Sequence, residues 1–596
     1  MGIAAAPASE PVRLPPAPAP LPPPQSQATP DLRLLPAQLV DPEPTWKRRL
    51  FEGIAVLIAV GFFYFILSYW MPAHPGVDQN GYLVGGKMVA RTGSSGFRPE
   101  NPFQYVGGMW VMIGEPGKED VWYYPKYPIG LPLLDAIPLW VNWEHGKTWA
   151  LYVSPVGAAL GVLGMFFLAR QLAGSFIGIM AMLLLAMNVT TLGLANNPNS
   201  HAPALAFVVW GMFMLLRWWQ TGSIWRGILA GFLLGYAVTI RYSEGLLLLP
   251  MLVAVLSALN YRRIVDVSWW RIGVCLAIVG SATWLRIRWD AQHALWIAAF
   301  AGVATVAALT PWWRLRFDWK SPHLWRGAAA VALVTGVIAL NVPDGLDDSY
   351  ERNALKILAL TSTAILLFIF SNPAWRRAAV PLLAWCVPVL WLFGFNWFAM
   401  GSITGYDSTN ESTGFTMGEF QNKWEFTVYD LYLYGAFCLL PLMLMGLAVM
   451  WRWNWRVALA LLLWLVPGVL LYAAYYWGND LVGLSYLRFF LTLLPAMILP
   501  AVWMLRHGGW SDAGSGSDQP ANAIAMPIAG GILVAICSVI ALRSSLPAME
   551  REQVANANLH YTCETITSNV PAGSVLFADQ RGGGGMSALL NFIQWR

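Results

Sequence analysis

The sequence has few charged residues. Only 12% of its 596 residues are Asp, Glu, Lys or Arg, whereas soluble domains contain about 25%. The mean hydropathy is +0.51, and apolar runs recur that match the roughly 20 residues a helix needs to cross a bilayer. These features exclude a soluble globular protein. They predict an all-α polytopic membrane protein with about 13–15 transmembrane helices and a long first extracytoplasmic loop.

The sequence also lacks the spacing of a metal or redox site. Its five cysteines form no CxxC pattern, and four of them lie within apolar runs. No cluster of Asp, Glu and His requires a metal ion either. We therefore predict that the cysteines pack within the protein and that no metal or other cofactor is needed.

The net charge of +5 does not indicate nucleic-acid binding, because the Lys and Arg residues stand in short clusters between apolar runs. This pattern is typical of cytoplasmic loops. Thirteen of the first 44 residues are Pro, so no signal peptide is expected and residues 1–46 are predicted to form a disordered cytoplasmic tail. The first apolar run, 51–71, follows Lys47, Arg48 and Arg49 and is predicted to be a signal anchor with its N-terminus in the cytoplasm.

From this anchor onward, basic loops alternate with acidic or polar loops, and Arg286 and Arg288 are the clear exception. The further spans are predicted near 149–169, 173–193, 203–218, 226–241, 245–259, 268–285, 293–310, 325–341, 354–370, 378–399, 431–450, 456–476, 487–505 and 525–543. Residues 47–543 are therefore expected to form one transmembrane domain, in which 72–148 is the first extracytoplasmic loop. Residues 544–596 are expected outside the cytoplasm, with a turn and strand near 569–579. This tail is predicted either to dock on the loops or to begin a further domain. No internal repeat typical of transporters is present.

Two residues of the first outer loop have two interpretations each. Asp78 precedes a short amphipathic segment that ends at Gly93, so it is either the N-cap of a surface helix or a carboxylate that accepts a proton from a hydroxyl group. Lys126 stands in the Tyr- and Pro-rich run 124–134. Its ammonium group either binds a lipid phosphate or extends to lipid headgroups.

Three features occur in an order that resembles a known superfamily. Asp78, the run 124–134 and the run 231–250 together resemble the GT-C glycosyltransferases, specifically bacterial relatives of the protein O-mannosyltransferases and of the aminoarabinose transferase of lipid A. The resemblance covers roughly residues 45–505. It implies a multi-pass protein of the bacterial inner membrane that transfers a sugar from a polyprenyl-phosphate donor to an extracytoplasmic acceptor, with inversion.

The resemblance also implies roles for individual residues. Asp78 matches the catalytic base, although the best-known members carry Asp-Glu where this sequence has Gln79 after Asp78. Lys126, Arg241 and Arg488 match positions that bind the donor phosphate. Arg241 has an alternative role as the partner of Glu244 on one helix face. Arg488 has an alternative position at the membrane interface.

Three further residues match the donor or sugar side of the family site, namely Tyr82, His201 and Tyr406. A loop histidine is more often incidental than functional. The polar loop that contains Tyr406 is also compatible with an ordinary solvent-exposed loop. For these residues the functional and the ordinary interpretations both stay open.

Two other functions are compatible with this organisation. A transporter or flippase of lipid-linked saccharides would place ionisable residues deep within its spans, and a glycan polymerase usually has its long loop late in the chain. Here the charges gather at the outer ends of spans and the longest loop comes first, which favours the transferase. Its predicted partners are the polyprenyl-phosphate sugar, membrane lipids and an acceptor that is a protein, a lipid or a glycan.

Overall fold

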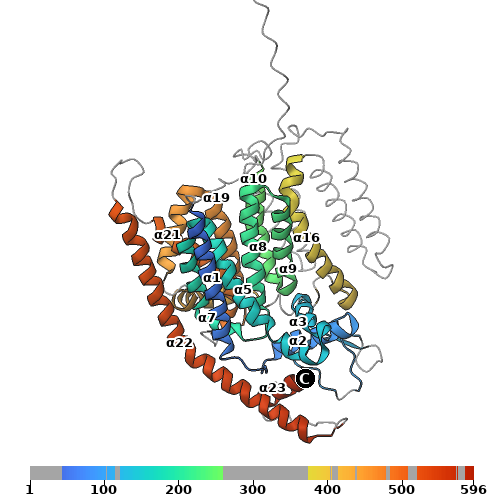
Figure 1. The fold of residues 1–596 in the computed structure, drawn as a ribbon. Helices are drawn as coiled ribbons and strands as arrows, with labels where there is room; N and C mark the ends of the chain where they lie inside the picture. The colour runs from blue at the N-terminus through green and yellow to red at the C-terminus, as the bar shows by residue number, and fades with distance from the viewer. Residues whose placement is uncertain are drawn as a thin grey trace, which may run out of the picture.

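The computed structural model describes residues 43–101, 104–114, 121–259, 373–402, 405, 414–435, 439–477, 484–507, 520–571, 574 and 584–595. Within these ranges the chain is helical except for loops and one two-stranded sheet (Figure 1). The predicted all-α class is confirmed. Four predicted spans lie outside the described residues, namely 268–285, 293–310, 325–341 and 354–370.

The elements are numbered as in Figure 1. The first half of the chain contains α1 Thr45–Leu67, α2 Val77–Thr92, β1 Trp110–Ile113, β2 Trp122–Pro125, α3 Gly130–Val141, α4 Trp143–Ala150, α5 Val153–Ala173, α6 Ser175–Ala186, α7 Val189–Ala195, α8 His201–Thr221, α9 Ile224–Ile240, η1 Tyr242–Leu247 and α10 Leu248–Ala258. The second half contains α16 Pro373–Met400, α18 Met417–Asp430, η3 Leu431–Gly435, α19 Leu440–Ala473, α20 Leu484–Leu487, η4 Arg488–Leu493, α21 Leu494–His507, α22 Pro520–Asn569 and α23 Gly584–Trp595.

Seven helical segments in the described part of the chain are long and apolar enough to cross a membrane. An eighth span results if α6 and α7, which bend by 62° at their junction, count as one. Residues 440–450 and 456–473, from the predicted crossings 431–450 and 456–476, lie in the two arms of α19. The arms separate at Asn454, whose backbone leaves helical geometry at φ −152° and ψ 85°. The protein is therefore a multi-pass membrane protein.

Small residues let the central helices approach closely. Hypothetical Cβ atoms on Gly157 and Gly161 of α5 would lie within about 3 Å of α8. A Cβ on Gly231 of α9 would lie 2.0 Å from the carbonyl oxygen of Pro381, and one on Gly235 would lie 2.5 Å from that of Trp385. Because lipid offers apolar side chains no hydrophobic gain, such close van der Waals contact is what holds membrane helices together. The glycines of the run 231–250 thus join α9 to α16.

Helices α2 and α3 and the β1–β2 hairpin form a small unit at one end of the bundle (Figure 1). The strands pair antiparallel with Trp110 opposite Pro125. Helix α2 ends at Gly93, whose φ of 78° is left-handed. Its N-cap is Gly76, and no side chain caps the helix. The N-cap interpretation of Asp78 is therefore wrong, since Asp78 lies inside the first turn and its carboxylate has other partners.

The C-terminal region differs from its prediction. Helix α22 continues to Asn569, well beyond the predicted span 525–543, because no Gly or Pro interrupts residues 548–570 and Pro571 follows the helix end. The predicted strand near 569–579 lies largely outside the described residues. Figure 1 shows α22 along the flank of the bundle and α23 beside α2.

Helix α23 docks on α2 through polar contacts. Of the two predictions for the C-terminal tail, docking on the first outer loop is the one that the structure shows. Asn80 Nδ2 donates to Gln594 Oε1 at 2.8 Å, and Lys87 Nζ donates to the carbonyl oxygen of Trp595 at 3.0 Å. Gln594 in turn donates to the Tyr105 carbonyl oxygen at 3.0 Å. The rings of Phe592 and Trp595 are fully buried at this contact. The last helix is therefore a packed part of the unit that carries Asp78.

The Phe592→Ala variant is expected to loosen this contact by about 3–5 kcal/mol, because it removes a fully buried ring and leaves a cavity. Faster proteolysis and faster amide exchange confined to α23 would report the change. The half-buried Leu589 provides the matched control, and Leu589→Ala should have the smaller effect. Equal protection of α23 in wild type and Phe592→Ala would contradict the docking.

Lys87, at the contact between α2 and α23, makes the free energy of unfolding depend on pH. Burial, followed by the nearby cations Lys147 and Arg91, lowers the pKa of Lys87 from 10.5 to about 8. Between these two pH values the unfolded chain binds more protons than the folded protein, so the free energy of unfolding rises with pH. Thermal unfolding in detergent is therefore expected to shift upward from pH 8 to 10. Lys87→Met should flatten this slope, whereas Lys47→Met, at the far end of the bundle, should keep it.

Candidate functional site

The predicted base and one predicted phosphate-binding residue are in contact. Asp78 Oδ2 lies 3.3 Å from Arg488 Nη1, and Asp78 Oδ1 accepts a hydrogen bond from the Tyr127 hydroxyl at 2.7 Å. The side chains of Asp78 and Arg488 are each 23% exposed. Helix α2 and helix η4, about 400 residues apart in sequence, thus meet at a carboxylate that solvent and a substrate can reach.

Two tyrosines form the wall behind Asp78. The rings of Tyr82 and Tyr127 stack with their centroids 4.5 Å apart, and Tyr82 also hydrogen-bonds the Ser200 side chain. Burial is the largest of the effects that raise the pKa of each phenol above its usual value. Both hydroxyl groups therefore stay protonated at neutral pH, and Tyr127 acts as a hydrogen-bond donor to Asp78.

Arg241 lies at the break between α9 and η1, where its extended backbone interrupts the helix. Its Nη1 lies 2.7 Å from His201 Nδ1, and its Nη2 donates to the Tyr472 hydroxyl at 2.7 Å. Its Nε lies 3.9 Å from Glu244 Oε1. Because a guanidinium group can only donate, His201 Nδ1 is the acceptor and the ring carries its proton on Nε2. Arg241 is thus held on three sides, and its predicted pairing with Glu244 is one of these contacts.

His201 and Phe489 lie between the residues around Arg241 and the Arg488 segment that contacts Asp78. The imidazole of His201 hydrogen-bonds the backbone of Arg488. The Phe489 ring lies 5.9 Å from His201 and stacks on Tyr472 at 5.1 Å, measured between ring centroids. The structure therefore brings together five of the seven predicted site residues, namely Asp78, Tyr82, His201, Arg241 and Arg488.

The other two predicted site residues are Lys126 and Tyr406. The backbone amide of Lys126 donates to the Met109 carbonyl oxygen at 3.1 Å, and its ammonium group lies 5.7 Å from the centroid of the Tyr127 ring. Lys126 thus stands beside the tyrosine that binds Asp78. Tyr406 lies outside the described residues.

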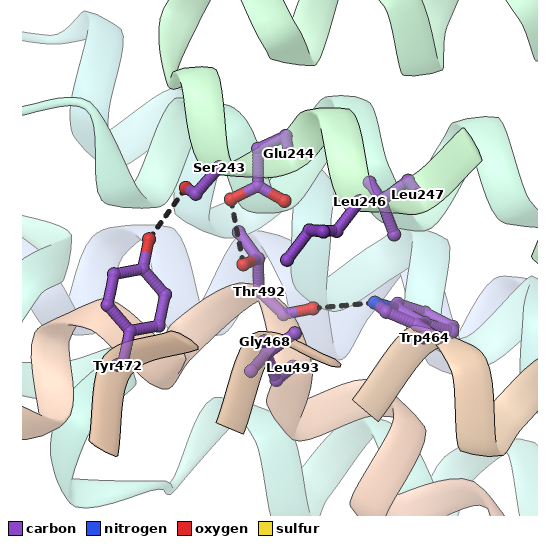
Figure 2. Close-up of a pocket in the computed structure, with 9 residues that line it drawn as sticks. All are labelled: Ser243, Glu244, Leu246, Leu247, Trp464, Gly468, Tyr472, Thr492 and Leu493. Carbon is purple, nitrogen blue, oxygen red and sulfur yellow. Dashed lines mark hydrogen bonds between the residues drawn. The ribbon is translucent and has the colours of Figure 1, made fainter. Parts of the chain in front are cut away.

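A pocket is lined in part by Glu244 and Tyr472, as Figure 2 shows, and these two residues also contact Arg241. The Tyr472 hydroxyl donates to Ser243 Oγ at 2.6 Å, and Thr492 Oγ1 donates to Glu244 Oε1 at 2.9 Å. Apolar side chains complete the lining, namely Leu246, Leu247, Trp464 and Leu493. The polar groups of this pocket thus bind one another and Arg241. Among the residues that the structure describes, no three His, Cys, Asp or Glu side chains group closely enough to hold a metal ion.

Three residues of the site escaped sequence reasoning, namely Tyr127, Tyr472 and Thr492. Tyr127 stands within the quoted run 124–134, where only Lys126 attracted a role. Tyr472 ends a span, and aromatic residues at span ends are usually lipid anchors, so the sequence contains no signal for it. Gln79 donates to Asn197 Oδ1 and thus joins α2 to the turn before α8.

The fold and the site define a polytopic helical membrane protein with a carboxylate and two arginines at one end of its bundle. Residues 144–287, about a quarter of the chain, match the family model described as dolichyl-phosphate-mannose-protein mannosyltransferase. The matched segment contains His201 and Arg241. The predicted resemblance is confirmed there.

Solved structures of two membrane proteins are similar to the chain at low identity. One is the oligosaccharyltransferase AglB from Archaeoglobus fulgidus in complex with an inhibitory peptide and a dolichol-phosphate, at 12% identity and a TM-score of 0.39. This match covers 92% of this chain and 64% of that one, so the chain spans less than two thirds of AglB. The other is ArnT from Cupriavidus metallidurans bound to undecaprenyl phosphate, at 14% identity, a TM-score of 0.25 and coverage of 77% and 78%. No curated protein matches the sequence.

Proposed function

We propose that the protein is a membrane glycosyltransferase that moves a sugar from a polyprenyl-phosphate donor to an acceptor hydroxyl group. The observation that carries the proposal is the contact of the partly exposed Asp78 carboxylate with Arg488, beside the buried Arg241. The Asp78 carboxylate can accept a proton, and the guanidinium groups of Arg241 and Arg488 can bind an anion. The family match over residues 144–287, which contains Arg241, supports the same reaction.

The proposed reaction is a single in-line displacement at the anomeric carbon. The acceptor oxygen forms a bond to this carbon and loses its proton to Asp78, while the bond from the carbon to the phosphate oxygen breaks. The departing polyprenyl phosphate keeps the electron pair, and the guanidinium groups of Arg241 and Arg488 with the Lys126 ammonium group stabilise its charge. This displacement inverts the anomeric configuration.

The burial of Tyr82 and His201 suggests how they serve this reaction. Tyr82 stacks on Tyr127, and His201 binds Arg241, so we propose that both contribute mainly by holding the groups that contact the donor. Tyr406 stays a predicted sugar-binding residue.

The proposed setting is a bacterial inner membrane with α2, α3 and α23 on the extracytoplasmic side. Helix α1 begins at the opposite end of the bundle (Figure 1), where Arg170 Nη1 lies 2.5 Å from Glu52 Oε1 and Arg217 is close by. Basic residues at that end agree with a cytoplasmic location. Residues 47–543 would then form the catalytic domain, preceded by the cytoplasmic tail 1–46.

The test is reconstitution in lipid vesicles with radiolabelled polyprenyl-phosphate sugars and membrane extracts as acceptors. A transferase releases unlabelled polyprenyl phosphate and places the label on an acceptor. Movement of the intact lipid-linked saccharide across the vesicle without cleavage would instead identify a flippase. Native lipid extracts extend the donor panel. If these extracts show no cleavage of a donor and no movement of a lipid-linked saccharide, the proposal is contradicted.

A further inference from the structure

We propose that the donor phosphate competes with Asp78 for Arg488, so that the donor must bind before Asp78 can act as a base. This inference rests on the proposed transferase function and adds an order of events to it. Binding of the donor would thus release the base that deprotonates the acceptor, through a single arginine.

In the described state both oxygens of Asp78 are occupied. Oδ1 accepts from Tyr127 at 2.7 Å, and Oδ2 faces Arg488 Nη1 at 3.3 Å. The guanidinium group of Arg488 therefore stands beside the oxygen that an acceptor hydroxyl group must reach. Tyr127 is fixed by its stacking on Tyr82, so Oδ2 is the oxygen that departure of Arg488 would free for the acceptor proton.

The two arginines of the site differ in how firmly they are held. The Arg241 side chain is 7% exposed and is bound by His201, Tyr472 and Glu244. The Arg488 side chain is 23% exposed, and its buried Nε has no hydrogen-bond partner among the described atoms. A guanidinium group that turns its Nε and Nη edge toward a phosphate gains two parallel hydrogen bonds. Arg488, whose guanidinium carbon lies 5.0 Å from the centroid of the Phe489 ring, therefore has fewer polar partners than Arg241 and an unused donor for this exchange.

The charges of the site support the same exchange. Arg241 has Glu244 at 3.9 Å and Arg488 has Asp78 at 3.3 Å, so each cation already has an anion. The phosphodiester of a donor carries one negative charge, and the released monoester carries about −1.5 to −2 at neutral pH. The product thus holds Arg488 more strongly than the donor does, and Arg488 returns to Asp78 only when the polyprenyl phosphate leaves.

The proposed competition predicts that a substitution of Asp78 strengthens the binding of polyprenyl phosphate, whereas substitution of an ordinary binding-site residue weakens it. If Asp78 competes for Arg488, Asp78→Asn should bind polyprenyl phosphate more tightly than wild type, by roughly tenfold. If Arg488 instead stays on Asp78 when the phosphate binds, loss of the Asp78 charge only removes repulsion of the phosphate, and the gain should then be as large in the Arg488→Gln background.

The experiment measures the Kd of polyprenyl phosphate in nanodiscs for wild type, Asp78→Asn, Arg488→Gln and the double variant. The expected gain for Asp78→Asn should vanish in the Arg488→Gln background. Glu144→Gln, which removes a carboxylate of α4 outside the site, controls for the change in net charge and should bind as wild type does. Asp78→Ser replaces Asp78→Asn if the latter unfolds at lower temperature than wild type.

The outcomes separate this inference from the function on which it rests. A wild type that transfers sugar, with Asp78→Asn binding no more tightly, overturns the competition alone. A gain of equal size in Glu144→Gln also overturns it, since net charge would then be the cause. A wild type that neither binds polyprenyl phosphate nor cleaves any donor overturns the transferase and the competition together.

Discussion

Replacement of Asp78 by Asn is expected to lower kcat by roughly 10²–10⁴-fold, because the amide cannot accept the proton that the acceptor hydroxyl loses. The amide oxygen can still accept from Tyr127, so α2 should stay in place. Release of polyprenyl phosphate from a labelled donor, measured in proteoliposomes, gives the rate, and donor binding confirms that the site is intact.

The matched control for this loss is Glu144→Gln, which should keep the wild-type rate. A loss of less than about fivefold in Asp78→Asn would mean that another group takes the proton and would remove Asp78 from the mechanism.

Arg241→Gln is expected to have the second large effect. It should reduce turnover more than 100-fold through loss of a charge that stabilises the departing phosphate. It should also destabilise the protein by about 3–5 kcal/mol, because Glu244, whose side chain is 4% exposed, would be left as a buried charge whose remaining partner among the described residues is Thr492. Thermal unfolding and initial rates measure the two effects on the same preparation.

The double variant Arg241→Gln with Glu244→Gln separates these effects. Removal of the unpaired carboxylate should restore most of the stability but none of the turnover. Recovery of turnover together with stability would show that Arg241 is only a structural partner of Glu244, which is the alternative that the sequence leaves open.

Charges at the ends of apolar runs made much of the site predictable. Asp78, Arg241 and Arg488 stand out in the sequence because ionisable groups beside a membrane span are costly. The sequence could not show that Arg488 reaches Asp78 or that His201 receives a hydrogen bond from Arg241. These contacts join α2, α8, η1 and η4, and such packing depends on the whole bundle.

Two local predictions failed or fell short, each for its own reason. A carboxylate before an apolar stretch is typical of an N-cap, but Tyr127 and Arg488 compete successfully for Asp78. The polar composition after residue 543 concealed the continuation of α22, because helical propensity without an apolar run is a weak signal. Docking on α2, through Asn80 and Lys87, gives the final helix its place.

The most direct test of the account is a cryo-electron microscopy structure of the protein in a nanodisc with bound polyprenyl phosphate. The account predicts the phosphate within hydrogen-bond distance of Arg241 or Lys126 and of Arg488, with Arg488 withdrawn from Asp78. A phosphate bound elsewhere, such as among Arg170 and Arg217 at the other end of the bundle, would contradict the proposed site and with it the proposed reaction.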